Sequence, residues 1–314
     1  MEYFILFLAV LCIAVQFNIN KAYQKKFVRG MRDIFFFPFA GGTVNLIFFS
    51  LLSLIFYGGL PDFSAFSFTM SIILAVVSAL SSLVGILIMK YGKMSVYSVF
   101  MMLGGMMLPY FYGLLFLSED ISAARITGLI ILICALPCSV INPAAKKDNT
   151  NTPQPKFYYI LCICIFLLNG TMSIISKSHS INASAIPAAN FIVYANLWSM
   201  IINGTAYYIF ARRFKKSKKM NARADIYDIN EVTPNKIQAV LTAAVFAIVG
   251  GSGFLFQLIS AETVPAVALY PFVTGGAIVL SSAGARIFFK EKISKPALAG
   301  IIMSIFGTLL FLIQ

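Results

Sequence analysis

The chain has 314 residues, of which 60% are hydrophobic and 11% are charged, and its mean hydropathy is +0.88. Soluble domains carry charge on about a quarter of their residues, so this composition excludes an ordinary soluble enzyme or binding domain. The lipid bilayer must therefore be the solvent for most of the chain.

Ten apolar segments approach the length of about 20 residues that a helix needs to cross a bilayer. They are Tyr3–Asn20, Ile34–Tyr57, Phe66–Met89, Met94–Leu117, Ser122–Ile141, Phe157–Ser176, Ile186–Ala211, Lys236–Leu258, Thr263–Phe288 and Ser294–Ile313. Strands of membrane barrels are shorter and alternate polar with apolar residues, whereas these segments are continuous. We therefore predict an all-α integral membrane protein with ten transmembrane helices.

The basic residues are distributed very unevenly between the loops. The loops after the first, third, fifth, seventh and ninth segments carry 22 of the 24 lysines and arginines, and the other side has only Arg125 and Lys177. Cytoplasmic loops are enriched in lysine and arginine, so this pattern predicts that both termini lie outside. The run "RRFKKSKK" at 212–219 is expected to lie against anionic headgroups, and residues 215–235 are expected to form a flexible loop.

A motif in the first half of the chain recurs in the second half at an offset of 172 residues. The pattern F-x2-E-x-I-S-x5-G appears as "FLSEDISAARITG" at 116–128 and as "FFKEKISKPALAG" at 288–300. Each copy joins the fourth predicted helix of its half to the fifth. We therefore predict two five-helix repeats, residues 1–145 and 157–314, joined by a linker at 146–156. Because five is odd, the second repeat would cross the membrane in the opposite direction.

The repeated motif supplies three kinds of residue to each half. The serines are predicted to cap the helix that follows, and the glutamates to lie beside the N-terminus of that helix, where negative charge is favourable. The glycines allow helices to approach closely. We expect these residues to support the scaffold rather than to bind substrate. They are Glu119, Ser122, Gly128, Glu291, Ser294 and Gly300.

The chain resembles the EamA-type members of the drug/metabolite transporter superfamily along nearly its whole length. The resemblance rests on the two motif copies, on "ALYPFVTGGAIVLSSAGARIFFKEKIS" in the ninth helix, and on the ends "QFNINKAYQKK" and "NGTMSIISKSHS" of the first and sixth helices. It implies two inverted five-helix repeats and transport by alternating access. Family members usually have glycine before the motif glutamate, where this chain has Ser118 and Lys290. Several members have both termini in the cytoplasm, opposite to the orientation that the loop charges predict.

Polar residues within the predicted helices are candidate substrate ligands. Gln16 and Asn20 share one face of the first helix, and Asn169, Ser173 and Lys177 form a stripe along the sixth. The family resemblance implies that the first, third, fourth, sixth, eighth and ninth helices line the cavity. The alternative is that these side chains hydrogen-bond between helices, as polar residues in membranes commonly do. The complete candidate set is Gln16, Asn20, Asn45, Asn169, Ser173, Lys177, Gln257, Tyr270 and Thr274.

These features predict a secondary transporter that moves a small polar metabolite, similar to an amino acid, sugar or nucleoside, across a bacterial cytoplasmic membrane. Acidic residues lie only at helix ends and His179 is expected in a solvated loop, so no buried proton relay is predicted. Efflux of lipophilic drugs or cations is the alternative. A membrane-embedded lipid enzyme is a remote one, because it needs clustered catalytic groups.

The expected partners are the substrate and the lipid bilayer. We expect no enzymatic activity, cofactor, metal or nucleic acid. The sequence leaves open whether the protein is a monomer or a homodimer, which solute it moves, in which direction, and with which coupling ion.

Overall fold

The computed structural model describes residues 2–27, 31–57, 59, 61–91, 94–120, 122–140, 156–220, 236–289 and 294–312. These residues form ten helices and no strand, which confirms the predicted helix number and order. The helices are α1 (Glu2–Phe27), α2 (Met31–Tyr57), α3 (Ala65–Tyr91), α4 (Met94–Phe116), α5 (Ala123–Val140), α6 (Lys156–Ser180), α7 (Ala188–Met220), α8 (Lys236–Thr263), α9 (Ala266–Phe289) and α10 (Lys295–Leu310).

Several helices continue beyond their apolar segments. α1 extends to Phe27 and α7 extends to Met220. The prediction that residues 215–220 belong to a loop is therefore wrong, because lysine is a good helix former and lets α7 continue past its apolar part. The remainder of that predicted loop, at 221–235, and most of the predicted linker, at 146–155, lie outside the described residues.

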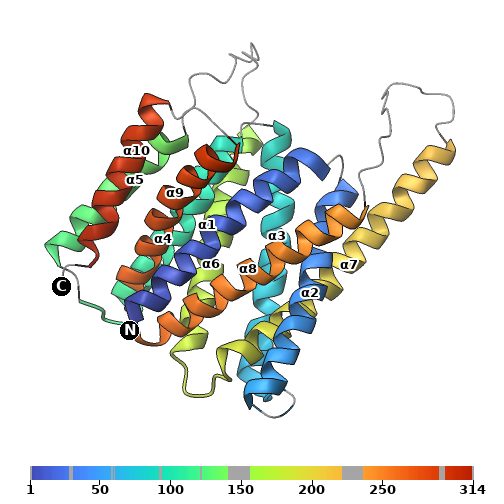
Figure 1. Ribbon diagram of the computed structural model, residues 1–314, viewed down its shortest axis with the longest axis horizontal. Helices are drawn as coiled ribbons and strands as arrows, with labels where there is room; N and C mark the ends of the chain where they lie inside the picture. Colours follow the sequence, from blue (N-terminus) through green and yellow to red (C-terminus); the bar gives the residue numbers. More distant parts are fainter. Residues whose placement is uncertain are drawn as a thin grey trace.

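The helices form a bundle in which neighbours in space are often distant in sequence (Figure 1). α2 lies along α7, α4 along α6, α5 along α10, and α1 along α8. α3 also contacts α6 and α7, α9 contacts α1 and α4, and α2 contacts α8. The α5–α10 pair forms one edge of the bundle, and α2 with α7 lies toward the opposite edge.

Glycines allow the closest helix crossings. A Cβ on Gly104 of α4 would overlap the backbone of Phe166 in α6. A Cβ on Gly128 of α5 would lie 2.9 Å from the carbonyl oxygen of Gly307 in α10. The predicted role of Gly128 in close helix approach is thus confirmed, and backbone contact of this kind is typical of helix pairs in membranes.

The bundle exposes large apolar side chains over much of its surface. Phe56, Leu115, Phe116 and Phe288 are each at least 70% exposed. Soluble monomers rarely expose extended apolar surfaces, whereas lipid is a favourable environment for them. Together with the long apolar helices described next, this surface indicates a membrane protein.

Seven helices are long and apolar enough to cross a bilayer, namely α1–α4, α6, α8 and α9. The apolar parts of α5 and α10 are shorter, at Ala123–Cys138 and Lys295–Leu310. α7 is less apolar because Asn190, Asn196 and Asn203 interrupt its hydrophobic residues. Membrane crossing by these three helices remains a prediction.

Candidate functional site

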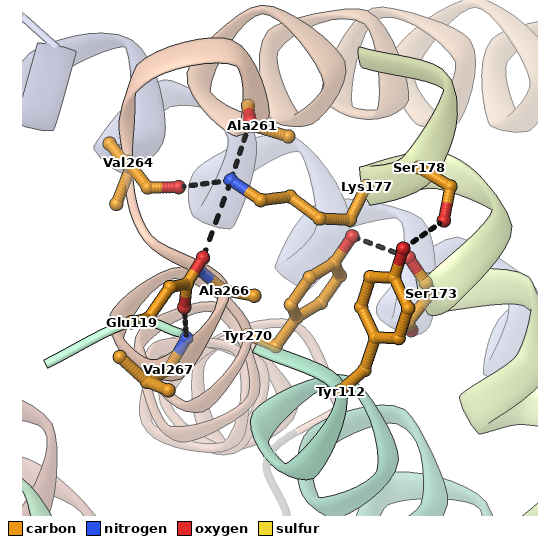
Figure 2. A network of polar contacts seen from close by, with 10 residues as sticks. All are labelled: Tyr112, Glu119, Ser173, Lys177, Ser178, Ala261, Val264, Ala266, Val267 and Tyr270. Atoms are coloured by element: carbon orange, nitrogen blue, oxygen red, sulfur yellow. Dashed lines mark hydrogen bonds and ion pairs between the residues drawn. The ribbon is translucent and has the colours of Figure 1, made fainter. Parts of the chain in front are cut away.

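A buried polar cluster lies where the ends of α4, α6 and α8 meet the start of α9 (Figure 2). α8 ends at Thr263 and α9 begins at Ala266, so the two helices are joined by a very short turn. The last carbonyl groups of α8 and the first amide groups of α9 have no partners within their own helices. Buried groups of this kind need other partners, and two charged side chains supply them here.

The turn after α4 carries Glu119 toward α9. The backbone amides of Leu117 and Glu119 both donate to the carbonyl oxygen of Gly113. Between them, Ser118 has a φ of 52°, in the left-handed region that favours glycine. A Cβ on Gly113 would overlap the Glu119 carboxylate, so the absence of a side chain at Gly113 makes room for it.

Glu119 caps α9 rather than the helix that follows it in sequence. The backbone amide of Ala266 donates to its Oε1 at 2.8 Å and that of Val267 donates to its Oε2 at 2.9 Å (Figure 2). The sequence predicted Glu119 beside the N-terminus of α5, and its carboxylate binds the first amides of α9. Ser122 caps α5 as predicted, since its Oγ accepts from the Arg125 backbone amide at 3.3 Å.

Lys177 of α6 is buried and fully partnered, with 3% of its surface exposed. Its Nζ donates to the carbonyl oxygens of Ala261 and Val264 at 2.8 and 2.9 Å, and lies 3.8 Å from Glu119 Oε1. The cation thus sits at the negative end of the α8 dipole, while the carboxylate sits at the positive end of the α9 dipole. Burying a charge costs several kcal/mol, and these contacts offset that cost.

Tyr270 joins α9 to α6 one helical turn away from these contacts. Its hydroxyl donates to the Ser173 carbonyl oxygen at 2.6 Å and also interacts with the Gln257 side chain. The structure therefore brings together four of the predicted ligands, Ser173, Lys177, Gln257 and Tyr270, with Glu119 beside them. These four came from three different predicted helices.

Two hydroxyl groups of this cluster were not among the predicted ligands. The Ser178 hydroxyl donates to the Tyr112 hydroxyl at 2.9 Å, which ties α6 to α4 (Figure 2). Ser178 directly follows Lys177, so its proximity to that lysine was visible in the sequence. Its distant partner Tyr112 had no comparable signal.

Asn169 and Ser173 hydrogen-bond to the backbone of α4. The Asn169 amide donates to the Met101 carbonyl oxygen at 2.7 Å, and the Ser173 hydroxyl donates to that of Gly105 at 3.3 Å. In this conformation both side chains join helices, which is the alternative that the sequence left open.

Gln16 and Asn45 pack against adjacent glycines of α8. A Cβ on Gly250 would overlap the Gln16 amide, and one on Gly251 would lie 2.9 Å from Asn45 Oδ1. That Oδ1 atom is buried and has no hydrogen-bond partner among the described residues. These two amides therefore fill the space that the absent side chains of two adjacent glycines leave on α8.

The remaining predicted residues lie apart from these groups or outside the described chain. Asn20 is half-buried in α1, and Thr274 is half-buried one turn beyond Tyr270 in α9. Ser294 caps α10 as predicted, accepting from the Ala297 backbone amide at 3.3 Å, and Gly300 is buried in α10. Glu291 lies outside the described residues.

His179 is buried within α6, so the prediction of a solvated loop histidine is wrong. It is 2% exposed, its Nε2 lies 3.0 Å from the Ser67 hydroxyl, and its ring stacks on Phe191 with a centroid distance of 3.8 Å. The physical reason is that α6 continues to Ser180, beyond the end of its purely apolar part.

A pocket of about 350 Å³ lies at the same end of the bundle as the cluster. His179, Glu262 and residues of the segment between α6 and α7 line it. Its volume is within the range of small-molecule sites. No group of three metal-ligating side chains occurs in the part of the chain that the structure describes.

The fold and this site define a polytopic, all-helical membrane protein with a charged pair buried at one end of its bundle. No family model and no curated protein matches the chain. A solved structure described as "Crystal structure of protein" is similar, with a TM-score of 0.68 and 11% sequence identity. The match covers 99% of this chain and 98% of the other, so the similarity concerns the whole fold.

Proposed function

We propose that the protein is a secondary transporter that moves a small polar metabolite across the membrane by alternating access. Two five-helix repeats, residues 1–145 and 157–314, would lie in opposite orientations and enclose the solute between them. Folds of this kind bind solute where the repeats meet and expose the site to each side in turn.

The observation that carries the proposal is the pattern of helix packing. If each helix is exchanged for the helix five places along the chain, the α1–α8 contact becomes α6–α3, and α4–α6 becomes α9–α1. By the same exchange, α3–α7 becomes α8–α2. All these contacts occur, and α2–α7, α4–α9 and α5–α10 map onto themselves. A twofold relation between the halves explains this pattern, and it agrees with the repeated sequence motif.

The polar groups available to a solute favour an uncharged or zwitterionic molecule. Among the described residues, the buried charge of Lys177 is already matched by Glu119 and two carbonyl groups. The neutral amides of Gln16 and Asn45 remain beside the α8 glycines, and Asn45 Oδ1 has no described partner. A buried unpaired acceptor costs about 1–3 kcal/mol, and a solute N–H or O–H group would remove that cost.

Solute exchange in proteoliposomes tests the proposal. Vesicles containing the purified protein are offered a panel of amino acids, sugars, nucleosides and amines, and protein-free vesicles give the background. We expect exchange of at least one class of solute, reduced at least tenfold by Asn45→Ala. The matched control is Asn196→Ala, because Asn196 bonds to the Ile192 carbonyl oxygen within α7. Absence of both flux and thermal stabilisation across the panel would contradict the proposal.

A further inference from the structure

Two sets of contacts join α6 and α9 at one end of the bundle. The ion-pair clasp comprises Glu119 and Lys177 with the backbone groups that they bind at the α8–α9 turn. The tyrosine clasp is the hydrogen bond from the Tyr270 hydroxyl to the Ser173 carbonyl oxygen, at 2.6 Å. Tyr270 follows Ala266 by four residues and Ser173 precedes Lys177 by four, so one helical turn separates the two clasps.

We propose that the two clasps form a gate that closes this end of the bundle, and that Tyr270 is the point at which a bound solute releases it. The proposal rests on the proposed transport function and adds a specific gate and a release residue to it. Glu119 reaches the gate from the α4–α5 turn of the first repeat, whereas Lys177 and Tyr270 belong to the second. Opening this end would therefore separate Glu119 of the first repeat from Lys177 and α9 of the second, whereas the tyrosine clasp joins two helices of the second repeat.

The two clasps differ in what their opening requires. Withdrawing Glu119 would leave its carboxylate and the amides of Ala266 and Val267 without partners and Lys177 without its ion pair, unless water enters. The Ser173 carbonyl oxygen, by contrast, lies within α6, where it can also accept from the amide four residues later. Tyr270 can therefore exchange this acceptor for a solute oxygen with little loss.

The solute chemistry that fits this step is a strong hydrogen-bond acceptor, such as the carboxylate of a neutral amino acid. Tyr270 would donate to that carboxylate instead of Ser173, which frees α9 from α6. Water could then reach the ion-pair clasp, where the charged groups would become hydrated. In the proposed order of events, the solute binds to Tyr270 first, and Glu119 and Lys177 separate afterwards.

A single cysteine at Ala266 reports on the gate. Ala266 is fully buried, and its amide is one of the groups that Glu119 caps. The five native cysteines are free and are first replaced by alanine. In vesicles opened by freeze–thaw, so that both faces meet a water-soluble maleimide, we expect slow labelling of Ala266→Cys. Adding Glu119→Gln should accelerate labelling at least tenfold, and adding Tyr270→Phe at least threefold.

A matched control separates gate opening from unfolding. Ala243→Cys is also fully buried, in α8 beside Tyr23 and Phe37, away from the gate. Its labelling should be unchanged by Glu119→Gln and Tyr270→Phe. If neither substitution accelerates labelling at Ala266, or if both cysteines respond equally, the gate is refuted.

The release role is tested with a mixture of neutral L-amino acids as the probe. We expect the mixture to accelerate labelling of Ala266→Cys at least threefold, and to have no effect when Tyr270→Phe is present. No effect on the protein with Tyr270 intact, or an equal effect on both proteins, would overturn the release role. The labelling of the gate variants needs no transported solute, so failure of the transport proposal and failure of the gate remain distinguishable.

Discussion

The ion-pair clasp and the glycine-lined face of α8 are two polar regions of opposite character. At the clasp, both charged side chains have partners, and Lys177 makes two hydrogen bonds in addition to its ion pair. At the α8 face, the side chains are neutral and pack closely against glycines, and Asn45 Oδ1 has no partner among the described residues.

This difference separates groups that hold the conformation from groups that can accept a solute. A fully partnered group binds a new ligand only by giving up an existing bond, whereas an unpartnered one needs no such exchange. We therefore assign Glu119, Lys177 and Tyr270 to the gate, and Gln16 and Asn45 to the solute site. Removing a polar side chain should then lower stability in the first region and leave it unchanged or raise it in the second.

The largest expected effect is that of Lys177→Met. Removing one partner of a buried ion pair leaves the other charge uncompensated, and we expect the protein to lose about 3–5 kcal/mol of stability. A thermal unfolding experiment in detergent measures this loss. The control is Lys26→Met, because Lys26 is exposed, and its described contacts are a hydrogen bond to Gln238 and the face of the Phe27 ring. Equal melting temperatures for the two variants would contradict a stabilising ion pair.

A smaller effect is expected for Gly251→Ala at the α8 face. The new Cβ would lie 2.6 Å from Phe49 Cε2 and 2.9 Å from Asn45 Oδ1. Phe49 is fully buried and has little room to move, so overpacking should cost about 2 kcal/mol. Gly59→Ala is the matched control, since nothing lies within 4 Å of its Cβ position. The unfolding temperatures of the two variants are compared with that of the unsubstituted protein. An unaltered temperature for Gly251→Ala would show that the face is not tightly packed.

Asn45→Leu should not lower the stability of the protein, in contrast to Lys177→Met. It removes a buried acceptor that lacks a described partner, so stability should stay the same or rise by about 1 kcal/mol. Solute exchange in proteoliposomes should nevertheless fall at least tenfold. A large loss of stability would mean that Asn45 supports the structure instead, and the distinction between the two regions would fail.

The smallest expected effect is that of Ser118→Gly. Ser118 has a φ of 52°, in the left-handed region. Replacing it with glycine removes the steric cost of this conformation, about 1 kcal/mol, while the greater entropy of glycine in the unfolded chain offsets roughly half of that gain in stability. We expect a gain of about 0.5 kcal/mol in thermal unfolding. Ser82→Gly within α3 should instead lose about 0.5 kcal/mol, because glycine is a poor helix former. A loss of stability for Ser118→Gly as well would contradict a strained turn before Glu119.

The sequence predicted helix number, helix order and local caps because these depend on residues close together along the chain. Ser122 and Ser294 cap the helices that follow them, and Gly128 makes a close crossing. The partner of Glu119 could not be predicted in the same way. Glu119 lies near both the start of α5 and, through folding, the start of α9, and sequence proximity favours the wrong helix.

The burial of His179 and the clustering of Lys177 with Tyr270 could not be predicted from the sequence for the same reason. Both depend on how far α6 extends and on which helices cross it. A stripe along one helix identified Ser173 and Lys177, but only the folded bundle, in which α4 packs against both α6 and α9, brings Tyr270 to Ser173. Ser118, directly before the motif glutamate, has a left-handed φ that favours glycine.

Solute counterflow tests alternating access most directly. Vesicles containing the protein are preloaded with an unlabelled solute from the exchange panel, and a trace of the labelled solute is added outside. A carrier that exposes one site to each side in turn should give a transient accumulation of label above its equilibrium level, which Asn45→Ala should abolish. Entry that only approaches equilibrium, at a rate unaffected by preloading, would contradict the account.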